Sequence, residues 1–370
     1  MSGGVDSSVT AKLLSEKDYD LSAVFMRNWD TRDESGTDKG CEWEKDWEDV
    51  QRVCEKLDIP CQMVDCSREY WLRVFEPSLK AWESGDTPNP DIWCNREVKF
   101  GALLDRLTEG TQFIATGHYA RKGHHPVSQR PQLLRPVDRH KDQTYYLSSI
   151  TEASLSKTLF PLSDLRKNEV REIAVRAGLH TASREESMGI CFVGEKRSFN
   201  QFLADYLPPK PGPIIDSVTG HTIGEHQGLW TYTIGQGAKI RGMQEKLFVA
   251  HKDKEQNTIF VVPSRCSHED LLVSNMRAKD WSWIWADEPP SAIDTPEGFH
   301  ARMQFRHRMI DVPCVVRRVA DGSILINLDA PQKAAATGQI AAIWDRDWCL
   351  GCGTIDAINL STASEHVFPA

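Results

Sequence analysis

The stretch Ser2-Gly3-Gly4-Val5-Asp6-Ser7-Ser8 decides the fold of the first part of the chain. It precedes an amphipathic helix whose apolar face carries Val9, Leu13 and Leu14. Two glycines let the backbone approach an anion, and the amides and hydroxyls that follow, with the helix N-terminus, can surround a chain of phosphates. The stretch therefore predicts a phosphate-binding loop. A tight turn with a serine N-cap is the alternative that the same residues allow.

Strand and helix patterns alternate after this loop. Short apolar runs predict strands at 21–26, 62–65 and 113–116. Apolar residues at three- and four-residue spacing predict helices over 47–57, 71–82, which stops near Gly85, and 98–107. Such alternation is typical of an α/β domain with a parallel sheet covered by helices on both faces.

The pattern changes beyond Gly194. The run Pro208-Pro209-Lys210-Pro211-Gly212-Pro213 predicts a stiff linker or turn, and Asp321-Gly322 predicts a hairpin turn. Short runs with strand character follow the linker, at 229–234, 258–262, 301–305, 314–319, 323–328 and 340–344. We therefore expect three domains: 1–197 with the loop, a small mostly-β central domain at 198–270, and a C-terminal β-barrel at 271–370.

Composition narrows the class of protein. A chain of 370 residues suits two or three domains, and 26% charged residues suit a soluble globular protein. The net charge of −9 argues against binding nucleic acid by bulk charge, although a local basic patch stays possible. Two segments, 121–141 and 302–318, are such basic islands. No apolar run is long enough to span a membrane, no targeting peptide is visible, and ten scattered cysteines favour a reducing compartment.

A cysteine follows a proline-rich segment, Thr87-Pro88-Asn89-Pro90-Asp91-Ile92-Trp93-Cys94. The prolines exclude regular structure up to Pro90, so we expect a helix to start around Asn95. Cys94 would then lie beside a helix N-terminus, where amide dipoles favour the thiolate. Asp91, three residues earlier, could share a face with it and move a proton. A buried structural cysteine beside an N-capping aspartate is the alternative.

Other cysteines are harder to interpret alone. Cys191 lies between a glycine-containing segment and Phe192 in Glu186-Ser187-Met188-Gly189-Ile190-Cys191-Phe192, where a cysteine usually packs as a small apolar residue. Cys349 and Cys352 have the spacing of a metal clip, but no second such pair accompanies them. We expect a structural hairpin there and no protein-bound metal.

Taken together and in this order, the loop and the two cysteine segments resemble the tRNA-specific 2-thiouridylases, ATP pyrophosphatases that replace the C2 oxygen of a wobble uridine with sulfur. Further strings fit the resemblance: Val24–Trp29, Ala115–Arg121, Lys141–Thr144, Gly224–Gly228 and Thr337–Gln339. Glu186–Gly189 and Phe305–Arg308 look more like the eukaryotic mitochondrial branch, which implies the mitochondrial matrix, or the cytoplasm for a bacterial chain. The strand that normally precedes the loop is absent, so the native chain would begin further upstream.

The resemblance implies a Rossmann-like domain of the adenine nucleotide alpha hydrolase type and a set of site residues. Cys94 would be the nucleophile, Cys191 the persulfide carrier and Asp91 a general acid or base. ATP, with Mg²⁺, would contact Met1, Ser2, Gly3, Gly4, Val5, Asp6, Ser7, Ser8, Met26 and Gly117. The tRNA would contact Asn89, Pro90, Asp91, His118, Lys141, Asp142, Gln143, Arg306, His307 and Gln339.

The implied partners are tRNAs for Lys, Glu and Gln and a sulfur donor supplied by a cysteine desulfurase relay. The implied cycle ends in a Cys94–Cys191 disulfide that a reductant opens; release of hydrogen sulfide by Cys94 is an alternative. Two other classes remain open. A synthetase that adenylates a small molecule for amidation would explain the loop but not the two cysteines, and an inactive RNA-binding protein would release no pyrophosphate.

Overall fold

The computed structural model describes residues 1–29, 42–107, 110–185, 198–265 and 270–359. The chain divides into two compact units. The first comprises 1–75, 91–197 and 347–349, and the second 76–90, 198–346 and 350–370. Over the described ranges, no helix combines the length and the apolar character needed to cross a membrane.

The first unit contains two pairs of parallel strands. β1 (Ala23–Arg27) runs parallel to β2 (Cys61–Asp65), and α3 (Glu42–Leu57) lies between them in the sequence. β3 (Ile114–Ala115) runs parallel to β6 (Thr158–Leu159). Parallel strands need a crossover connection, which the intervening helices supply. The predicted parallel α/β architecture is confirmed, and each of the three predicted strands is present.

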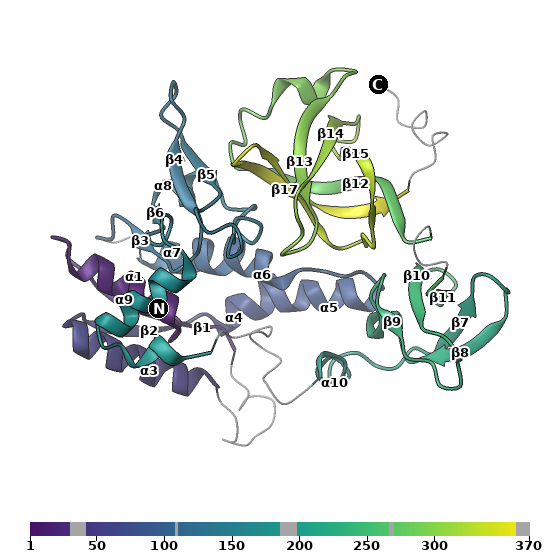
Figure 1. Cartoon of the computed structure of the whole chain (residues 1–370), viewed down its shortest axis with the longest axis horizontal. Helices are drawn as coiled ribbons and strands as arrows, with labels where there is room; N and C mark the ends of the chain where they lie inside the picture. The colour runs from purple at the N-terminus through teal and green to yellow at the C-terminus, as the bar shows by residue number, and fades with distance from the viewer. Residues whose placement is uncertain (30–41, 108–109, 186–197, 266–269, 360–370) are drawn as a thin grey trace. The chain divides into compact units, whose positions relative to one another are not determined.

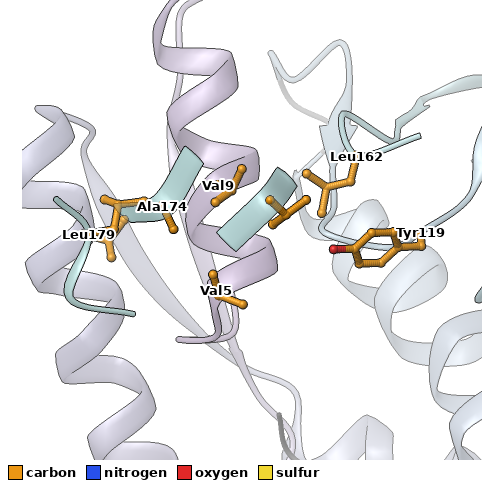
Figure 2. Close-up of a cluster of buried hydrophobic side chains, with 8 residues drawn as sticks. Val5, Val9, Tyr119, Leu162, Ala174 and Leu179 are labelled. Atoms are coloured by element: carbon orange, nitrogen blue, oxygen red, sulfur yellow. The ribbon is translucent and has the colours of Figure 1, made fainter. Parts of the chain in front are cut away.

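The helix after the phosphate loop is fixed by apolar packing. α1 (Val5–Ser15) packs against α9 (Lys167–Arg176). Figure 2 shows Val5 and Val9 of α1 between Leu179 and Ala174 on one side and Leu162 on the other. A second apolar cluster packs α1 against β1 and α3. Because both clusters hold α1, the loop at its N-terminal end has a fixed support.

The cysteine segment is helical from an earlier residue than expected. α6 (Pro90–Trp93) continues into a wide, π-helical stretch, Cys94–Ala102, and then into α7 (Leu103–Leu107). The expected start near Asn95 is therefore wrong. Proline suits the first position of a helix, since its missing N–H would have no partner there. Cys94 is consequently the fifth helical residue.

The remaining elements of the first unit are short. β4 and β5 form an antiparallel hairpin, and Trp348 and Cys349 pair with Leu134 and Leu133 of β5. The bounds are α4 (Ser67–Tyr70), a π-helical stretch Trp71–Phe75, β4 (Arg121–His124), β5 (Pro131–Leu134), α8 (Glu152–Ser156) and a 3-10 turn His180–Ser183.

The second unit begins with α5 (Glu76–Glu83), which ends two residues before Gly85, near the predicted stop. Gly85 has φ of 87°, and its N–H donates to the carbonyl of Trp82. A five-stranded sheet follows, in the order β8-β7-β11-β10-β9. Its members and the helix before it are α10 (Phe199–Leu203), β7 (Gly212–Asp216), β8 (Thr222–His226), β9 (Gly237–Ala238), β10 (Leu247–Asp253) and β11 (Thr258–Pro263).

Six antiparallel strands complete the second unit, and Figure 1 shows them in green to yellow. β12 pairs with both β15 and β17, so the order β12-β15-β14-β13-β16-β17 closes into the predicted barrel. Asp321 and Gly322 form the predicted turn between β14 and β15. The bounds are β12 (Leu272–Trp283), β13 (Phe299–Gln304), β14 (Val312–Arg318), β15 (Ile324–Lys333), β16 (Ile340–Asp345) and β17 (Trp348–Ile358), with a 3-10 turn at Ser291–Asp294.

Two local predictions are wrong. The expected strand at 229–234 is a 3-10 turn, Leu229–Thr231, because buried Leu229 packs onto Gly85. The expected hairpin at Cys349–Cys352 lies inside β17, because Gly351 approaches the Ser282 carbonyl at a φ of 154° and so allows the strand to continue. The three-domain boundaries at 197 and 270 stay a prediction.

Candidate active site

The phosphate loop is a compact turn at the start of α1. The hydroxyls of Ser7 and Ser8 both donate to the carbonyl of Gly4, at 3.1 and 2.9 Å. Gly3 has φ of 74°, and a Cβ there would lie 2.8 Å from the Asp46 carbonyl, so only glycine fits. At Gly4 a Cβ would meet only the Ser2 hydroxyl, at 3.8 Å. One side of the backbone at Gly4 is therefore open to a ligand.

Asp6 of the loop is held by two residues that lie far away in the sequence. The Lys167 ammonium donates to both carboxylate oxygens, at 2.7 and 2.8 Å, and the Tyr119 hydroxyl donates to one of them at 3.0 Å. The backbone of Gly117 packs on the loop, where a Cβ would lie 2.9 Å from the Ser7 nitrogen. The resemblance placed Asp6, Ser7 and Gly117 in the nucleotide site, but it did not predict Lys167 or Tyr119 as partners of Asp6.

A second cation supports the loop from the other side. Arg184 donates to the Gly3 carbonyl at 3.0 Å and to the Asp49 carboxylate at 2.6 Å, and it pairs with Asp46. His180 also contacts Asp49, at 2.8 Å. Neither Lys167 nor Arg184 stands in a motif, so no local sequence signal identifies them.

The remaining predicted ATP contacts have different surroundings. Met1 packs partly buried against both apolar clusters of α1, and its ammonium donates to the Val24 carbonyl of β1. Val5 is a core residue, 4% exposed, so its side chain is structural. Met26 is half-buried in β1. No described contact joins Met26 to the loop.

Cys94 is 8% exposed, and its sulfur accepts a hydrogen bond from the side-chain amide of Asn28, at 3.7 Å. Asn28 directly follows β1. Ligand groups gather at the carboxyl ends of parallel strands, and this rule is the signal that could have identified Asn28. Because Cys94 is the fifth helical residue, the expected stabilisation by the helix N-terminus is weak, since that effect fades within the first turn.

Burial shifts the pKa values of two groups around the cysteine helix, Asp91 and His118, towards their neutral forms. Burial raises the pKa of Asp91, and the nearby Lys99 cation offsets part of that rise. Burial, followed by repulsion from Lys99, holds the pKa of His118 well below its ordinary value. Lys99 lies 3.5 Å from His118 and donates to Asn95 at 3.1 Å. A carboxyl group whose pKa is raised by burial is better suited to deliver a proton than an ordinary carboxylate.

Several residues predicted to contact tRNA are engaged within the first unit. Asp142 pairs with Arg135, and both side chains are about nine-tenths buried. Gln143 accepts from the Tyr119 backbone at 2.9 Å. His118 is half-buried between the rings of Phe100 and Phe160. Gln143 and His118 therefore shape the region around residues 117–119, whereas Asp142 is engaged by Arg135 and Thr144. Lys141 is half-buried.

Other predicted tRNA contacts belong to the second unit. Arg306 is exposed and lies over the ring of Phe305, and His307 is half-buried. The Gln339 side chain accepts from the Ala336 amide at 2.9 Å. Asn89 is half-buried and Pro90 buried.

The two basic islands are partly neutralised by ion pairs with acidic residues. Five of their arginines form ion pairs: Arg130 with Glu152, Arg135 with Asp142, Arg139 with Asp347, Arg302 with Asp311 and Arg318 with Asp294. A count of charges along the sequence cannot show this, because four of these acids lie outside the islands. The islands are less basic than they look.

Cys191 and its segment 186–194 lie outside the described residues. No group of three or more His, Cys, Asp or Glu side chains suited to a metal occurs over the described ranges. The only carboxylate of the phosphate loop, Asp6, is engaged by Lys167. Mg²⁺ characteristically binds few protein carboxylates and several phosphate oxygens, so this loop fits a metal that arrives with the nucleotide.

Fold and site together define a nucleotide-binding α/β enzyme with a cysteine beside its first strand, followed by two β domains. Comparison with known families gives the same order: residues 1–195 match the tRNA methyl transferase HUP domain, 200–263 the corresponding PRC-barrel domain, and 273–355 the aminomethyltransferase β-barrel domain.

Curated relatives identify the family more closely. The chain is 42% identical over 361 residues to the tRNA-specific 2-thiouridylase MnmA of Geobacillus thermodenitrificans (strain NG80-2), covering 97% of this chain and 94% of the relative. It is 43% identical over 363 residues to the enzyme of the same name from Alkaliphilus oremlandii (strain OhILAs), covering 97% and 96%. The chain belongs to the tRNA-specific 2-thiouridylase family.

Proposed function

We propose that this chain uses ATP to replace the C2 oxygen of the wobble uridine of tRNA with sulfur. One observation carries the proposal: β1 links the phosphate loop to the cysteine. Met1, directly before the loop, donates to Val24 of β1, and Asn28, directly after β1, contacts Cys94. A nucleotide site and a thiol supported by one strand suit a reaction in which adenylation is followed by sulfur chemistry. Family membership supports the same reaction.

The first step is adenylation. The uracil must leave the base stack, because stacking shields its C2 oxygen. That oxygen attacks the α-phosphorus of ATP, pyrophosphate leaves, and the N3 proton is lost. The loop amides and Lys167 would stabilise the phosphates, with Asp6 holding Lys167 at the loop. Mg²⁺ would enter on the phosphate oxygens and neutralise part of their charge.

The second step is sulfur transfer. Cys191 would carry a persulfide, whose terminal sulfur attacks C2 and expels AMP. The Cys94 thiolate then attacks the Cys191 sulfur, which forms a Cys94–Cys191 disulfide and releases 2-thiouridine. An external thiol reduces the disulfide. Asp91, whose pKa burial raises, would carry the proton that these steps exchange.

Finer assignments belong to the same proposal. The substrates would be the tRNAs for Lys, Glu and Gln, and a cysteine desulfurase relay would supply the sulfur. The mitochondrial matrix would be the location, supported by the strings Glu186–Gly189 and Phe305–Arg308. The base would contact Asn89, Pro90 and Asp91, and the tRNA body would contact Lys141, Arg306 and their sequence neighbours.

The decisive experiment combines purified protein, ATP, unmodified tRNA and a persulfide donor, and measures 2-thiouridine by mass spectrometry of the digested tRNA. We expect one 2-thiouridine per tRNA and one pyrophosphate per 2-thiouridine. An amidated metabolite in place of thiolated tRNA would identify a small-molecule synthetase. Tight tRNA binding with no pyrophosphate would identify an inactive RNA-binding protein.

A further inference from the structure

The contact between Asn28 and Cys94 joins two segments that no motif connects. Asn28 follows β1, whereas Cys94 begins the π-helical stretch 94–102. The side-chain nitrogen of Asn28 lies 3.7 Å from the Cys94 sulfur, within the range of a hydrogen bond to sulfur. Asn28 is half-buried and Cys94 buried, so the pair is largely shielded from solvent. A polar contact in such surroundings is stronger than one in water.

The orientation of the amide indicates which form of the sulfur it suits. A thiolate can only accept hydrogen bonds, so Asn28 must turn its nitrogen towards the sulfur. That orientation turns the carbonyl oxygen away. Over the described residues, the Asn28 side-chain oxygen is buried and has no hydrogen-bond partner. An unsatisfied buried oxygen is costly, and this arrangement is the one that serves a negatively charged sulfur.

We propose that Asn28 is a positioning residue for the reaction: its side-chain amide donates to Cys94, fixes the sulfur and stabilises the thiolate that attacks the persulfide. The proposal rests on the proposed function in assigning that attack to Cys94. The Asn28 amide would supply the stabilisation of the thiolate that the helix N-terminus does not give, because Cys94 lies beyond the first turn of its helix. A neutral donor also adds no charge beside Asp91, Lys99 and the Arg96–Glu97 ion pair, which lie on the same helical segment.

Two substitutions separate the donor from the volume of the side chain. Asn28→Ala removes the donor, and Asn28→Asp keeps the shape but places a carboxylate against the sulfur. The measurement is the rate at which iodoacetamide alkylates Cys94 as a function of pH, followed on the Cys94 peptide by mass spectrometry. We expect about tenfold slower alkylation at neutral pH for Asn28→Ala, and a larger loss for Asn28→Asp.

Because Cys94 is buried, slow alkylation could also reflect poor access of iodoacetamide, so a second measurement uses no reagent. The ultraviolet absorbance of the thiolate is titrated in each protein and compared with its Cys94→Ser counterpart, so that only Cys94 contributes. We expect the thiolate to form at higher pH in both variants. Asn28→Gln, which keeps an amide donor, should recover part of the difference. Asp91, Lys99 and His118 are unchanged throughout, so they cannot cause it.

The matched control is Asn168→Asp, the same change at an exposed position of α9 in the same unit. It should leave the Cys94 titration unchanged. Folded Asn28→Ala and Asn28→Asp proteins that titrate like the wild type would overturn the proposal, since a purely structural amide would not move the thiol. The titration needs no turnover. If the wild type failed to thiolate tRNA, the proposed function would fail while the Asn28–Cys94 coupling could still be measured.

Discussion

The phosphate loop and the cysteine helix lie in the same unit, but they hold charge in opposite ways. At the loop, Asp6 is paired with Lys167, and Arg184 with Asp46 and Asp49, so full charges face one another. At the cysteine helix, burial drives Asp91 and His118 towards their neutral forms, and the sulfur meets a neutral amide.

This difference matches the two kinds of chemistry. A triphosphate keeps its charge throughout, so a loop of fixed ions and dipoles can stabilise it without proton transfer. Sulfur transfer to a base exchanges protons, and a carboxyl group whose pKa burial raises, such as Asp91, is better suited to that exchange than an ordinary carboxylate. In the proposed mechanism, one unit would therefore contain an ionic half, the loop, that binds phosphates and a largely neutral half, the cysteine helix, that moves protons.

The two cysteines give the strongest test of the neutral half. Cys191→Ser should adenylate tRNA but accept no labelled persulfide sulfur, whereas Cys94→Ser should accept that sulfur but complete no turnover. Without reductant, the wild type should accumulate a Cys94–Cys191 disulfide in stoichiometric amount, detected by peptide mapping. Label on Cys94 would reverse the two roles.

The control is Cys314→Ser in the barrel. Burial raises the pKa of Cys314 to about 12, so this residue stays a thiol. Its replacement should cost roughly 1–2 kcal/mol of stability and leave thiolation intact. Full thiolation by either Cys94→Ser or Cys191→Ser would contradict the mechanism.

Asp6→Ala tests the ionic half. We expect pyrophosphate release to fall by a factor of roughly 100 or more, because Lys167 loses the two bonds that hold it at the loop. The measurement is pyrophosphate released per tRNA. Asp356→Ala, which breaks an ion pair with Arg277 in the barrel, is the control and should lower only stability. Normal ATP turnover in Asp6→Ala would contradict the assignment of the loop as the ATP site.

The same contrast explains what the sequence could predict. Local patterns located the loop, the strands β1 and β2 and the barrel turn at Asp321-Gly322. Gly117 was implied by the family resemblance, and its role stays a prediction. Local patterns could not locate Lys167 or Arg184, because these residues reach the site only through tertiary packing. Asn28 could have been located from its place directly after a strand of the parallel sheet.

Local patterns also predicted the helix to start near Asn95, whereas it starts at Pro90, and they overestimated the net positive charge of the basic islands. The charge of the islands depends on acidic partners that mostly lie outside them. The helix start depends on a rule with two outcomes, since proline can end a loop or begin a helix.

Lys252 in β10 tests, in the second unit, whether burial of a charged side chain has a larger effect on its pKa than its hydrogen-bond partner has. It is 7% exposed, donates to the Gly85 carbonyl at 2.9 Å, and burial lowers its pKa to about 8. The folded protein therefore holds fewer protons than the unfolded chain between about pH 8 and the ordinary pKa of 10.5, so this group makes stability rise with pH in that window.

The expected rise in the free energy of unfolding across this window is about 3 kcal/mol, which corresponds to the gap between the two pKa values. Urea unfolding of the wild type and Lys252→Met at several pH values isolates it, because the other groups cancel in the difference. Lys254→Met, which removes an exposed partner of Asp86, should show no such rise. A pH-independent difference for Lys252→Met would show that pairing outweighs burial there.

The smallest effects are expected at the surface cations. Lys141→Ala and Arg306→Ala should each weaken tRNA binding several-fold and reduce its salt dependence by about one counterion per lost phosphate contact. Binding titrations over a range of salt concentrations measure both quantities. Lys17→Ala, an exposed lysine after α1, should change neither. An unchanged salt slope in both variants would place these side chains away from the tRNA backbone.

The pairing of Trp348 and Cys349 with β5 has a consequence for synthesis on the ribosome. These residues belong to the first unit, although about two hundred positions separate them from the strand they join. β12 likewise waits for β17 before the barrel can close. A nascent chain that has emerged only to residue 197 therefore lacks a strand segment of its own catalytic unit. Both units reach completion together, near the end of translation, so an early stop or a slow C-terminal segment would leave neither one finished.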